Sequence, residues 1–249
     1  MPNIAHFRFY EELNDFLPPE KHKVQFAYQF NGNPSVKDAI EAIGVPHVEV
    51  DLVIVNGRSV GFDYRLAGND SAAVYPVFES LDISPLVRLR EHPLRDPKFI
   101  CDVHLGKLAR LLRLAGFDTL YRNDYTDIQI VQYALPEKRC ILTRDRGILK
   151  RSAVTHGYCL RSTDPRRQAR EVLSRFDLYS RARPFSRCTE CNGSVVRADR
   201  DAVVPGLPQR TRECYDEFYK CDSCGRVYWQ GSHFESLRQT VSAMLRDSR

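Results

Sequence analysis

The sequence predicts an α/β protein in three parts, and three changes along the chain indicate them. Strand-like alternation surrounds one helical stretch in residues 1–84. Short apolar runs then alternate with helical stretches over residues 98–183, and cysteine, glycine and aromatic residues are prominent in residues 184–249. Prolines and charges between the first two parts predict a linker at 85–97. A chain of 249 residues is long enough for two or three such domains.

Residues 1–84 predict a ubiquitin-like β-grasp domain. HFRFY and KVQFAYQF alternate apolar and polar residues, as half-buried strands do. A short helix is expected between Ser35, which is placed to cap it with Asp38 three residues later, and Gly44, which ends it. VEVDLVIV, a tight turn at Asn56-Gly57, and AAVYPVF follow. Strand, hairpin, helix and further strands is the order of a β-grasp.

This first part resembles the sulfur-carrier branch of the β-grasp proteins in SVKDAIEAIGVP, VNG and VYPVF. Sulfur carriers act through the carboxylate of a terminal Gly-Gly. Here VYPVF is followed by Glu79, Ser80 and Leu81, and the chain continues, so carrier function is not expected. The resemblance instead implies a docking or regulatory role with a protein partner.

Residues 98–183 predict a parallel sheet covered by helices. Helical stretches are expected to end at Gly116 and Pro136, and one is expected to begin at Pro165. Short apolar strands that alternate with helices are typical of such sheets. The strands are expected in KFICDV, TLYR, RCILTR and GYCLR, and the helices in HLGKLARLLRLAG, DIQIVQYAL and PRRQAREVLSRF.

Three aspartates follow or connect these predicted strands. Asp102 follows Phe99-Ile100-Cys101, Asp145 follows Ile141-Leu142-Thr143-Arg144, and Asp127 begins a helix after the strand at 119–122. Such sheets bind ligands beyond the carboxyl ends of their strands, so the three carboxylates are expected to meet. Clustered carboxylates bind Mg²⁺ or Mn²⁺, which can activate water to hydrolyse a phosphodiester. The alternative for each aspartate alone is a helix or turn cap.

Four sequence elements, in this order, resemble one family. KFICDVHLGKLARLLRLAGFDTLYRNDYTD, LTRDRG, CTEC and YKCDSCGRVYWQGSH are similar to the Mut-seven C-terminal RNase domain, a PIN-like nuclease fold with a zinc ribbon. The resemblance covers residues 98 to 237, and implies catalytic, metal-binding roles for Asp102, Asp127 and Asp145. PIN domains commonly present four acids. The helix after Asp102 holds none, which leaves Asp124 and Asp164 as candidates for a fourth.

Basic side chains are concentrated in the middle of the chain. Residues 98–180 hold 16 Lys and Arg against 9 Asp and Glu, within a total net charge of +5. This predicts a polyanionic partner, which the resemblance implies is RNA, held through phosphates and weakened by salt. A solvated basic surface is the alternative. The candidate substrate contacts are Lys107, Arg110 and Arg113, which recur every third residue, and Arg144 and Arg146, which flank Asp145.

The cysteines form two classes. Cys101, Cys140 and Cys159 lie in apolar runs and are expected to pack as small hydrophobes. Two C-x-x-C pairs separated by 29 residues predict structural Zn²⁺ on four thiolates; a redox role is the less favoured alternative. Cys214 and His233 are not expected to bind it. Tyr228 and Trp229 either stack on RNA or fill the core of the ribbon. The predicted zinc ligands are Cys188, Cys191, Cys221 and Cys224.

The location and activity follow from these features. No apolar run reaches the length of about 20 residues that spans a membrane, and the N-terminus lacks the pattern of a signal peptide, so a cytoplasmic protein is expected. The predicted activity is metal-dependent hydrolysis of RNA. Two alternatives are a catalytically silent RNA-binding module and an adaptor that docks a partner through its β-grasp domain. The sequence leaves open whether cleavage is endo- or exonucleolytic.

Overall fold

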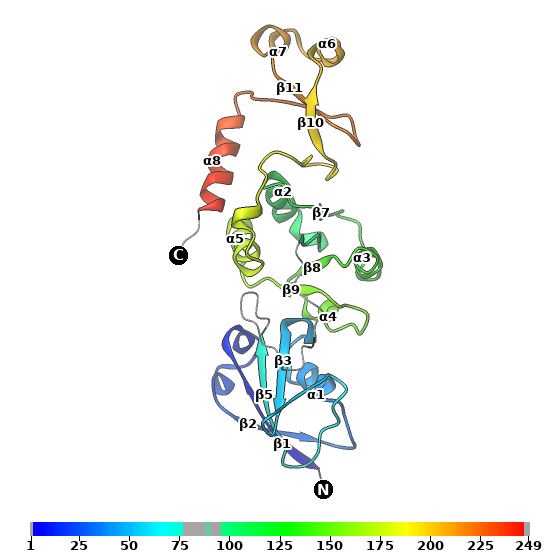
Figure 1. The fold of residues 1–249 in the computed structure, drawn as a ribbon, viewed down its shortest axis with the longest axis vertical. Coiled ribbons are helices and arrows are strands. Elements are labelled where there is room, and N and C mark those ends of the chain that lie inside the picture. The colour runs from blue at the N-terminus through cyan, green and yellow to red at the C-terminus, as the bar shows by residue number, and fades with distance from the viewer. Residues whose placement is uncertain (1, 77–88, 90–95, 247–249) are drawn as a thin grey trace. The chain divides into compact units, whose positions relative to one another are not determined.

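The computed structural model describes residues 2–76, 89 and 96–246 (Figure 1). The chain divides into two compact units. The first combines Met1–Asp96 with Asp145–Cys159, and the second combines Pro97–Arg144 with Leu160–Arg249. The predicted linker at 85–97 lies almost wholly outside the described residues.

The first unit contains the expected β-grasp fold. Its sheet has the strand order β2-β1-β5-β3-β4, in which β1 and β5 are parallel and the other pairs antiparallel (Figure 1). Helix α1 lies over this sheet and buries Val36, Ala39 and Ile40. The elements are β1 (Asn3–Phe9), β2 (Phe26–Phe30), α1 (Val36–Ile43), β3 (Val50–Val55), β4 (Arg58–Val60) and β5 (Ser71–Pro76).

Local signals in the sequence set the limits of these elements. The Ser35 hydroxyl accepts a hydrogen bond from the Asp38 backbone N–H, and the Asp38 carboxylate accepts one from the Ser35 backbone N–H, each at 3.1 Å. This reciprocal capping box begins α1 as predicted. Asn56 and Gly57 have φ angles of 50° and 80°, the left-handed backbone that a tight β3–β4 turn requires.

Residues 145–159 pack with the β-grasp domain in the first unit. The Glu49 carboxylate, 1% exposed, accepts a hydrogen bond from the Cys159 backbone N–H at 2.6 Å. His47 Nε2 lies 2.9 Å from the Val154 carbonyl oxygen. The β-grasp domain therefore holds a later segment of its own chain. That segment contains α4 (Arg146–Leu149) and β9 (Gly157–Cys159).

The second unit is built on parallel strands. β6 (Phe99–Cys101) pairs in parallel with β7 (Thr119–Leu120) on one side and β8 (Cys140–Thr143) on the other. From β6 the chain steps to one side of the sheet to form β7, and from β7 it steps back past β6 to form β8. Because both connections are right-handed, the helices α2 and α3 within them lie on opposite faces of the sheet. α2 and α5 pack together, with α3 across the sheet (Figure 1). These helices are α2 (Gly106–Leu114), α3 (Asp127–Ala134) and α5 (Pro165–Arg175).

A three-stranded antiparallel ribbon, in the order β10-β11-β12, follows in the same unit. The register pairs Val195 with Cys221 at one end of β10 and β11, and Ala198 with Phe218 at the other. Two short helices lie at the second end of β10 and β11, the end away from Cys221 (Figure 1). The elements are β10 (Val195–Ala198), α6 (Arg200–Val203), α7 (Gln209–Cys214), β11 (Phe218–Cys221) and β12 (Val227–Trp229).

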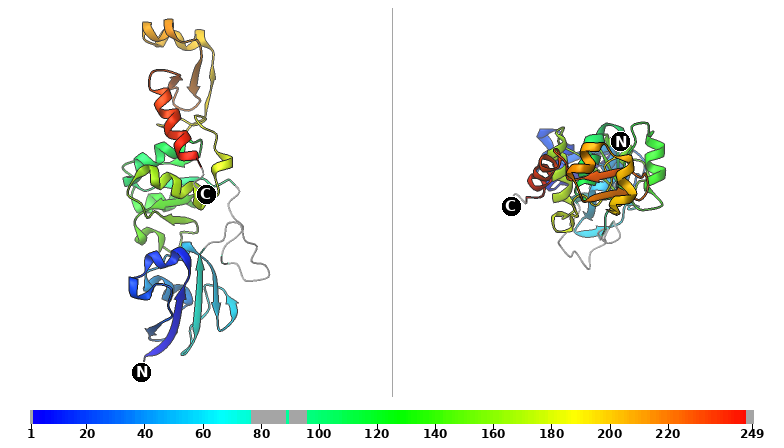
Figure 2. Two further views of the ribbon diagram at one scale, coloured as in Figure 1. Left: turned by 90° about the vertical axis from the view of Figure 1, so that its left-hand side faces the viewer. Right: turned by 90° about the horizontal axis from the view of Figure 1, so that it is seen from above.

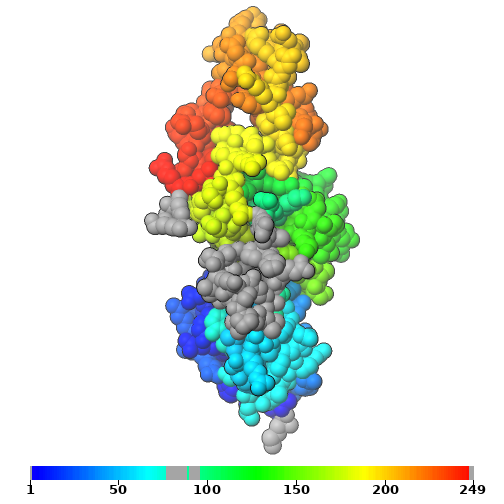
Figure 3. All heavy atoms as spheres, in the orientation of Figure 1, coloured from blue at the N-terminus to red at the C-terminus, as the bar shows by residue number. Residues whose placement is uncertain are grey.

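The helix α8 (Phe234–Leu245) returns from the ribbon to α5. Arg170 of α5 donates a hydrogen bond to the Ala243 carbonyl at 2.7 Å, and α8 buries Val241 and Met244. Figures 2 and 3 show α8, in red, beside the yellow segment of α5. Within the described residues, no helix combines the length and the apolar character needed to cross a membrane.

Candidate active site and cysteine cluster

Asp102 lies at the carboxyl end of β6 and contacts the neighbouring strand β8. Its backbone N–H donates to the Leu142 carbonyl at 3.0 Å. Its Oδ2 accepts a hydrogen bond from the hydroxyl of Thr143, which is fully buried, at 2.7 Å. The second carboxylate oxygen lies 3.4 Å from the backbone N–H of His104, at the start of a 3₁₀ turn. The carboxylate is thus oriented by the end of β8, at the edge where a parallel sheet binds ligands.

The other two predicted catalytic aspartates begin helices. Asp145 follows Thr143 by two residues and caps α4, accepting a hydrogen bond from Gly147 N–H at 2.7 Å. Asp127 is the first residue of α3, but Thr126 provides the cap in place of Asp127, through a capping box with Gln129. Asp102 and Asp145 each make the contact that the capping alternative predicts, whereas Asp127 is the first residue inside α3 and does not cap it.

The three aspartates are divided between the two units of the chain. Among the described residues, the group of metal-binding side chains whose ligand atoms all lie within 4.8 Å of one another consists of cysteines. Asp102 and Asp127 belong to the second unit and Asp145 to the first. The shared carboxylate site therefore stays a prediction.

The two candidates for a fourth acid have other contacts. Asp124 is exposed and forms a two-pronged ion pair with Arg122, at 2.8 and 2.9 Å. These hydrogen bonds hold the pKa of the Asp124 carboxyl below its ordinary value. Asp164 caps α5 by accepting from the Arg167 N–H at 2.9 Å. Neither the ion pair of Asp124 nor the helix cap of Asp164 indicates a role in binding a metal ion.

The predicted substrate contacts differ in their surroundings. Lys107, Arg110 and Arg144 are exposed. Arg146 donates to the Phe16 carbonyl at 3.1 Å and lies over the Phe16 ring, so its guanidinium contacts the β-grasp domain. Arg113 is 3% exposed, which differs from the expected solvent-facing row. The helical spacing places Arg113 correctly on the helix, but the ribbon packs against it.

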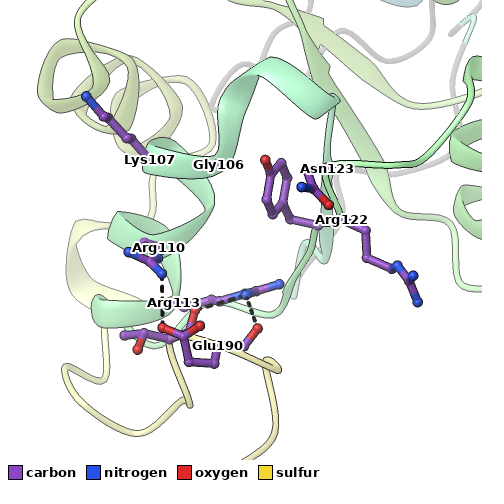
Figure 4. A pocket seen from close by; sticks show the side chains of 9 residues that line it. Gly106, Lys107, Arg110, Arg113, Arg122, Asn123 and Glu190 are labelled. Atoms are coloured by element: carbon purple, nitrogen blue, oxygen red, sulfur yellow. Dashed lines mark hydrogen bonds and ion pairs between the residues drawn. The ribbon is translucent and has the colours of Figure 1, made fainter.

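A pocket of about 460 Å³ lies beside α2 in the second unit (Figure 4). It is bounded by the start and middle of α2, by the loop after β7, and by the first cysteine turn. Figure 4 shows Arg110 reaching the Glu190 carboxylate, an ion pair of 3.1 Å. The lining residues are Gly106, Lys107, Arg110, Arg113, Tyr121, Arg122, Asn123, Thr189 and Glu190.

The four predicted zinc ligands form a compact cluster. Cys188, Cys191, Cys221 and Cys224 place their sulfurs within 4.8 Å of one another. The Sγ atoms are 3.7 Å apart for Cys188 and Cys224, and 3.3 Å apart for Cys191 and Cys221. Four sulfurs in a tetrahedron around Zn²⁺ at 2.3 Å lie about 3.8 Å apart. The cluster therefore fits a structural zinc ion; Cys214, at the end of α7, and His233 lie outside it.

The two cysteines of the first turn have opposite pKa shifts in the absence of a metal ion. Burial raises the pKa of the Cys188 thiol, but hydrogen bonds from the Cys191 N–H and the Tyr228 hydroxyl outweigh it and lower the pKa to about 6. Burial, and then the neighbouring thiols, raise the pKa of Cys191 to about 12. Gly193 allows the two turns to approach, because a Cβ there would lie 2.8 Å from the Cys221 sulfur.

The ribbon is fastened to the parallel sheet by polar contacts. Asn192 accepts a hydrogen bond from the Thr119 N–H at 2.9 Å and donates one to the Asp118 carboxylate at 2.7 Å. Arg113 donates to the carbonyls of Thr119, Thr189 and Glu190 at 2.8, 3.0 and 2.9 Å. The first cysteine turn is thereby held against α2 and β7.

Tyr228 and Trp229 of the ribbon contact the cysteine cluster and the small hydrophobic core. The Tyr228 hydroxyl lies 3.0 Å from the Cys188 sulfur. Trp229 packs against the small core of Val203, Leu207 and Phe218. These contacts favour the core role over stacking on RNA. Cys101, Cys140 and Cys159 are buried, as predicted.

Sequence reasoning missed several residues of this region. Thr143 is part of the LTRDRG motif, but nothing in the sequence indicates that this strand residue donates a hydrogen bond to Asp102. Tyr121, Arg122 and Asn123 were expected only as the end of a strand and a turn. Thr189 and Glu190 lie between the predicted zinc ligands Cys188 and Cys191, and the C-x-x-C pattern assigns no role to the two residues between its cysteines.

Two parts of the chain match known families. The model described as Mut7-C RNAse domain matches residues 97–241, and the model described as Mut7-C ubiquitin matches residues 2–82. A human protein named exonuclease mut-7 homolog is 36% identical over 118 residues. This alignment covers 45% of the present chain and 14% of the human protein.

Two solved structures resemble part of the chain. The crystal structure of small archaeal modifier protein 1 from H. volcanii has a TM-score of 0.24 and 17% identity, and covers 30% of this chain and 97% of that one. The crystal structure of SAMP1 from Haloferax volcanii has a TM-score of 0.26 and 16% identity, with coverages of 31% and 99%.

Proposed function

The chain belongs to the Mut7-C RNase domain family, and from this premise we propose that it is a metal-dependent ribonuclease. The proposed reaction is hydrolysis of RNA phosphodiester bonds in a PIN-like site at the carboxyl edge of β6 and β8. The observation that carries the proposal is the position of Asp102. Its carboxylate ends β6 and accepts a hydrogen bond from the buried Thr143 of β8.

The proposed metal ligands are Asp102, Asp127 and Asp145. Their carboxylate oxygens are the hard donors that Mg²⁺ or Mn²⁺ prefers. Each follows or connects strands of the parallel sheet, although they do not form a cluster of the kind made by the cysteines. A bound ion would activate water and stabilise charge on the phosphate. Thr143 would orient Asp102, and the exposed Lys107, Arg110 and Arg144 would bind backbone phosphates.

We also propose that Zn²⁺ occupies the four-cysteine cluster with a structural role. The sulfur spacing and the N–H groups directed at Cys188 and Cys191 support it. A complete shell of four thiolates leaves no open coordination position for catalysis. The expected composition is about one zinc ion per chain.

The β-grasp domain is proposed to have a docking role for a protein partner. Part of it already holds residues 145–159 through Glu49 and His47. A partner would therefore use another part of this domain. Val24 on the chain before β2 and Ile4 of β1 are exposed apolar side chains of this unit.

The direct test of the function is RNA cleavage by the full chain. End-labelled RNA is incubated with protein in Mg²⁺, Mn²⁺ or Ca²⁺, or without added divalent ions. We expect cleavage in Mg²⁺ or Mn²⁺ and none without them, and we expect Asp127→Asn and Asp145→Asn to reduce the rate while RNA binding persists. A labelled DNA of the same sequence tests the preference for RNA.

Other outcomes identify the alternatives. RNA binding without cleavage under every ionic condition would indicate a silent RNA-binding module. Absence of both binding and cleavage, together with a protein captured through the β-grasp domain, would indicate an adaptor. Cleavage unaffected by Asp127→Asn and Asp145→Asn would place the active site elsewhere.

A further inference from the structure

The pocket beside α2 contains a buried guanidinium that the fold holds in place. Arg113 lines this pocket and is 3% exposed. Its Nε and Nη1 donate to three carbonyl oxygens, whereas Nη2 makes no hydrogen bond within the described part of the chain. Burial lowers the pKa of Arg113, yet a guanidinium remains protonated at neutral pH. A ligand in the pocket would therefore meet a preorganised cation.

Further cations surround the mouth of the pocket. Lys107, Arg110 and Arg122 are exposed and line it, and Glu190 is the acidic residue among the lining side chains. Glu190 is shared by Arg110 at 3.1 Å and Arg226 at 3.7 Å. Arg122 is paired with Asp124, but Lys107, Arg110 and Arg113 against Glu190 still leave the lining with an excess of positive charge, which selects an anion.

Two features favour a nucleotide at the end of a strand. The volume of about 460 Å³ is in the range of small-ligand pockets, and is too small for a run of nucleotides. A terminal phosphate carries a charge of about −1.5 to −2, more than a phosphate within the strand, and offers three acceptor oxygens. The half-buried ring of Tyr121 adds an aromatic surface for a base.

Tyr121 is itself fixed beside the start of α2. Its hydroxyl donates to the Val103 carbonyl at 3.0 Å. A Cβ on Gly106 would lie 2.6 Å from the Tyr121 hydroxyl oxygen, so glycine permits the ring to pack there. The aromatic wall of the pocket is thus connected to the turn that begins at Asp102.

From these contacts we infer that the pocket binds the terminal phosphate and end nucleotide of an RNA strand; this inference rests on the proposed ribonuclease function. The 3₁₀ turn Val103–Leu105 separates Asp102 from Gly106. A 3₁₀ turn rises about 2 Å per residue, so Gly106, the first residue that lines the pocket, lies about 8 Å along the chain from Asp102. A strand held by its end would present linkages near that end to Asp102.

The test compares three versions of one short single-stranded RNA: with a 5′-phosphate, with a 3′-phosphate, and with hydroxyls at both ends. Fluorescence anisotropy measures their affinity for the full chain without Mg²⁺ or Mn²⁺. We expect one phosphorylated form to bind about tenfold more tightly than the hydroxyl form, because it gains charge-assisted hydrogen bonds. The preferred form identifies the end that the pocket accepts.

Variants at the exposed rim assign this preference to the pocket without disturbing Arg113. Lys107→Gln combined with Arg110→Gln should remove the preference for the phosphorylated RNA. Arg238→Gln is the matched control, because Arg238 is also an exposed arginine in an ion pair, with Glu235 on α8. It should retain the preference.

The outcomes separate the two proposals. Equal affinity for all three RNAs, or a preference that survives the double substitution, overturns the pocket inference and leaves the ribonuclease proposal standing. Failure of the wild-type chain to bind any of the RNAs overturns the pocket inference, and the cleavage assay in Mg²⁺ or Mn²⁺ then decides the ribonuclease proposal separately.

Discussion

Asp118 joins the parallel sheet to the ribbon through a small set of contacts. Its Oδ1 accepts hydrogen bonds from Arg139 and Asn192, each at 2.7 Å, and Arg187 lies 3.6 Å from Oδ2. Burial raises the pKa of this carboxyl, but the hydrogen bonds from Arg139 and Asn192 outweigh it. The pKa therefore lies below its ordinary value of 3.8 in the folded protein.

We predict that Asp118→Asn lowers the free energy of unfolding by about 2 kcal/mol at pH 7, because Arg139, 4% exposed on its side chain, loses the closer of its two carboxylate partners and keeps only Glu137 at 3.2 Å. A carboxyl with a lowered pKa stabilises the fold fully above its unfolded-state pKa of about 4, and loses this contribution as the pH falls through the folded-state pKa. Urea unfolding should show the wild type and the variant converging below pH 4. A constant difference would contradict the assignment. Asp124→Asn, with its exposed carboxyl, is the control and should unfold like the wild type.

Sequence reasoning at the residue scale succeeds where the signal is local. The two C-x-x-C pairs specify the cysteine cluster because each pair is a short turn and ligand spacing is fixed by the metal. Arg113 shows the limit of such reasoning. Helical periodicity places it on α2, but its burial depends on Thr189 and Glu190, more than 70 residues later. Long-range packing of this kind leaves no trace in the local pattern.

At the scale of elements, α2 is joined to the ribbon by a close backbone approach. Gly116 follows the helix with a φ of 97°. Arg183 N–H donates to the Ala115 carbonyl at 2.9 Å, so the later segment returns to the end of α2. A Cβ on Gly116 would lie 2.2 Å from the Arg183 carbonyl oxygen. The position therefore requires glycine for both its conformation and its space.

We predict that Gly116→Ala destabilises the protein by about 2 kcal/mol or more, because the left-handed conformation costs a non-glycine residue about 1–2 kcal/mol and the contact with Arg183 adds to it. Gly206→Ala is the control, since nothing lies within 4 Å of a Cβ there. Thermal unfolding of both variants measures the effect. Equal melting temperatures would show that the end of α2 relaxes freely.

The cysteine cluster supports more than the ribbon, because its first turn bonds to α2 and β7. We predict that Cys221→Ser loses zinc and lowers the melting temperature of the second unit, since thiolate ligation contributes directly to folding. Cys214→Ser should retain both zinc and stability, because Cys214 is exposed on α7 and lies outside the cluster. Metal content by mass spectrometry and calorimetric unfolding are the two measurements. A zinc-free Cys221→Ser chain with wild-type stability would exclude the structural role.

Elements with strong periodicity or clear caps could be predicted, and others could not. The capping box of α1 and the glycine after α2 are visible in the sequence. α6, α7 and α8 were not predicted. α7 has the polar sequence QRTREC and buries only Thr211, so its helix depends on packing and not on an apolar face. The segment 145–159 is predicted to belong to the nuclease domain, and its hydrogen bonds to Glu49 and His47 also hold it to the β-grasp domain within the first unit.

At the scale of the whole molecule, the candidate functional residues are distributed over two units. The second holds Asp102, Asp127, the basic pocket and the cysteine cluster, whereas the first holds the β-grasp domain with Asp145 and α4. The family architecture is apparent from the order of motifs along the chain. The grouping of Asp145 with the N-terminal domain is not, because it is set by contacts between residues about 100 positions apart.

The central claim is tested most directly by the rate of RNA cleavage in Mn²⁺ under single-turnover conditions, at protein concentrations that saturate the RNA. Asp102→Asn should lower this rate by about a hundredfold or more, because charge stabilisation at the reacting phosphate is lost, while RNA affinity is retained. Asp199→Asn controls for the loss of a negative charge at a helix cap, because Asp199 caps α6 in the ribbon, and it should cleave like the wild type. If Asp102→Asn cleaves RNA at the wild-type rate, the carboxylate at the end of β6 is not the catalytic metal site.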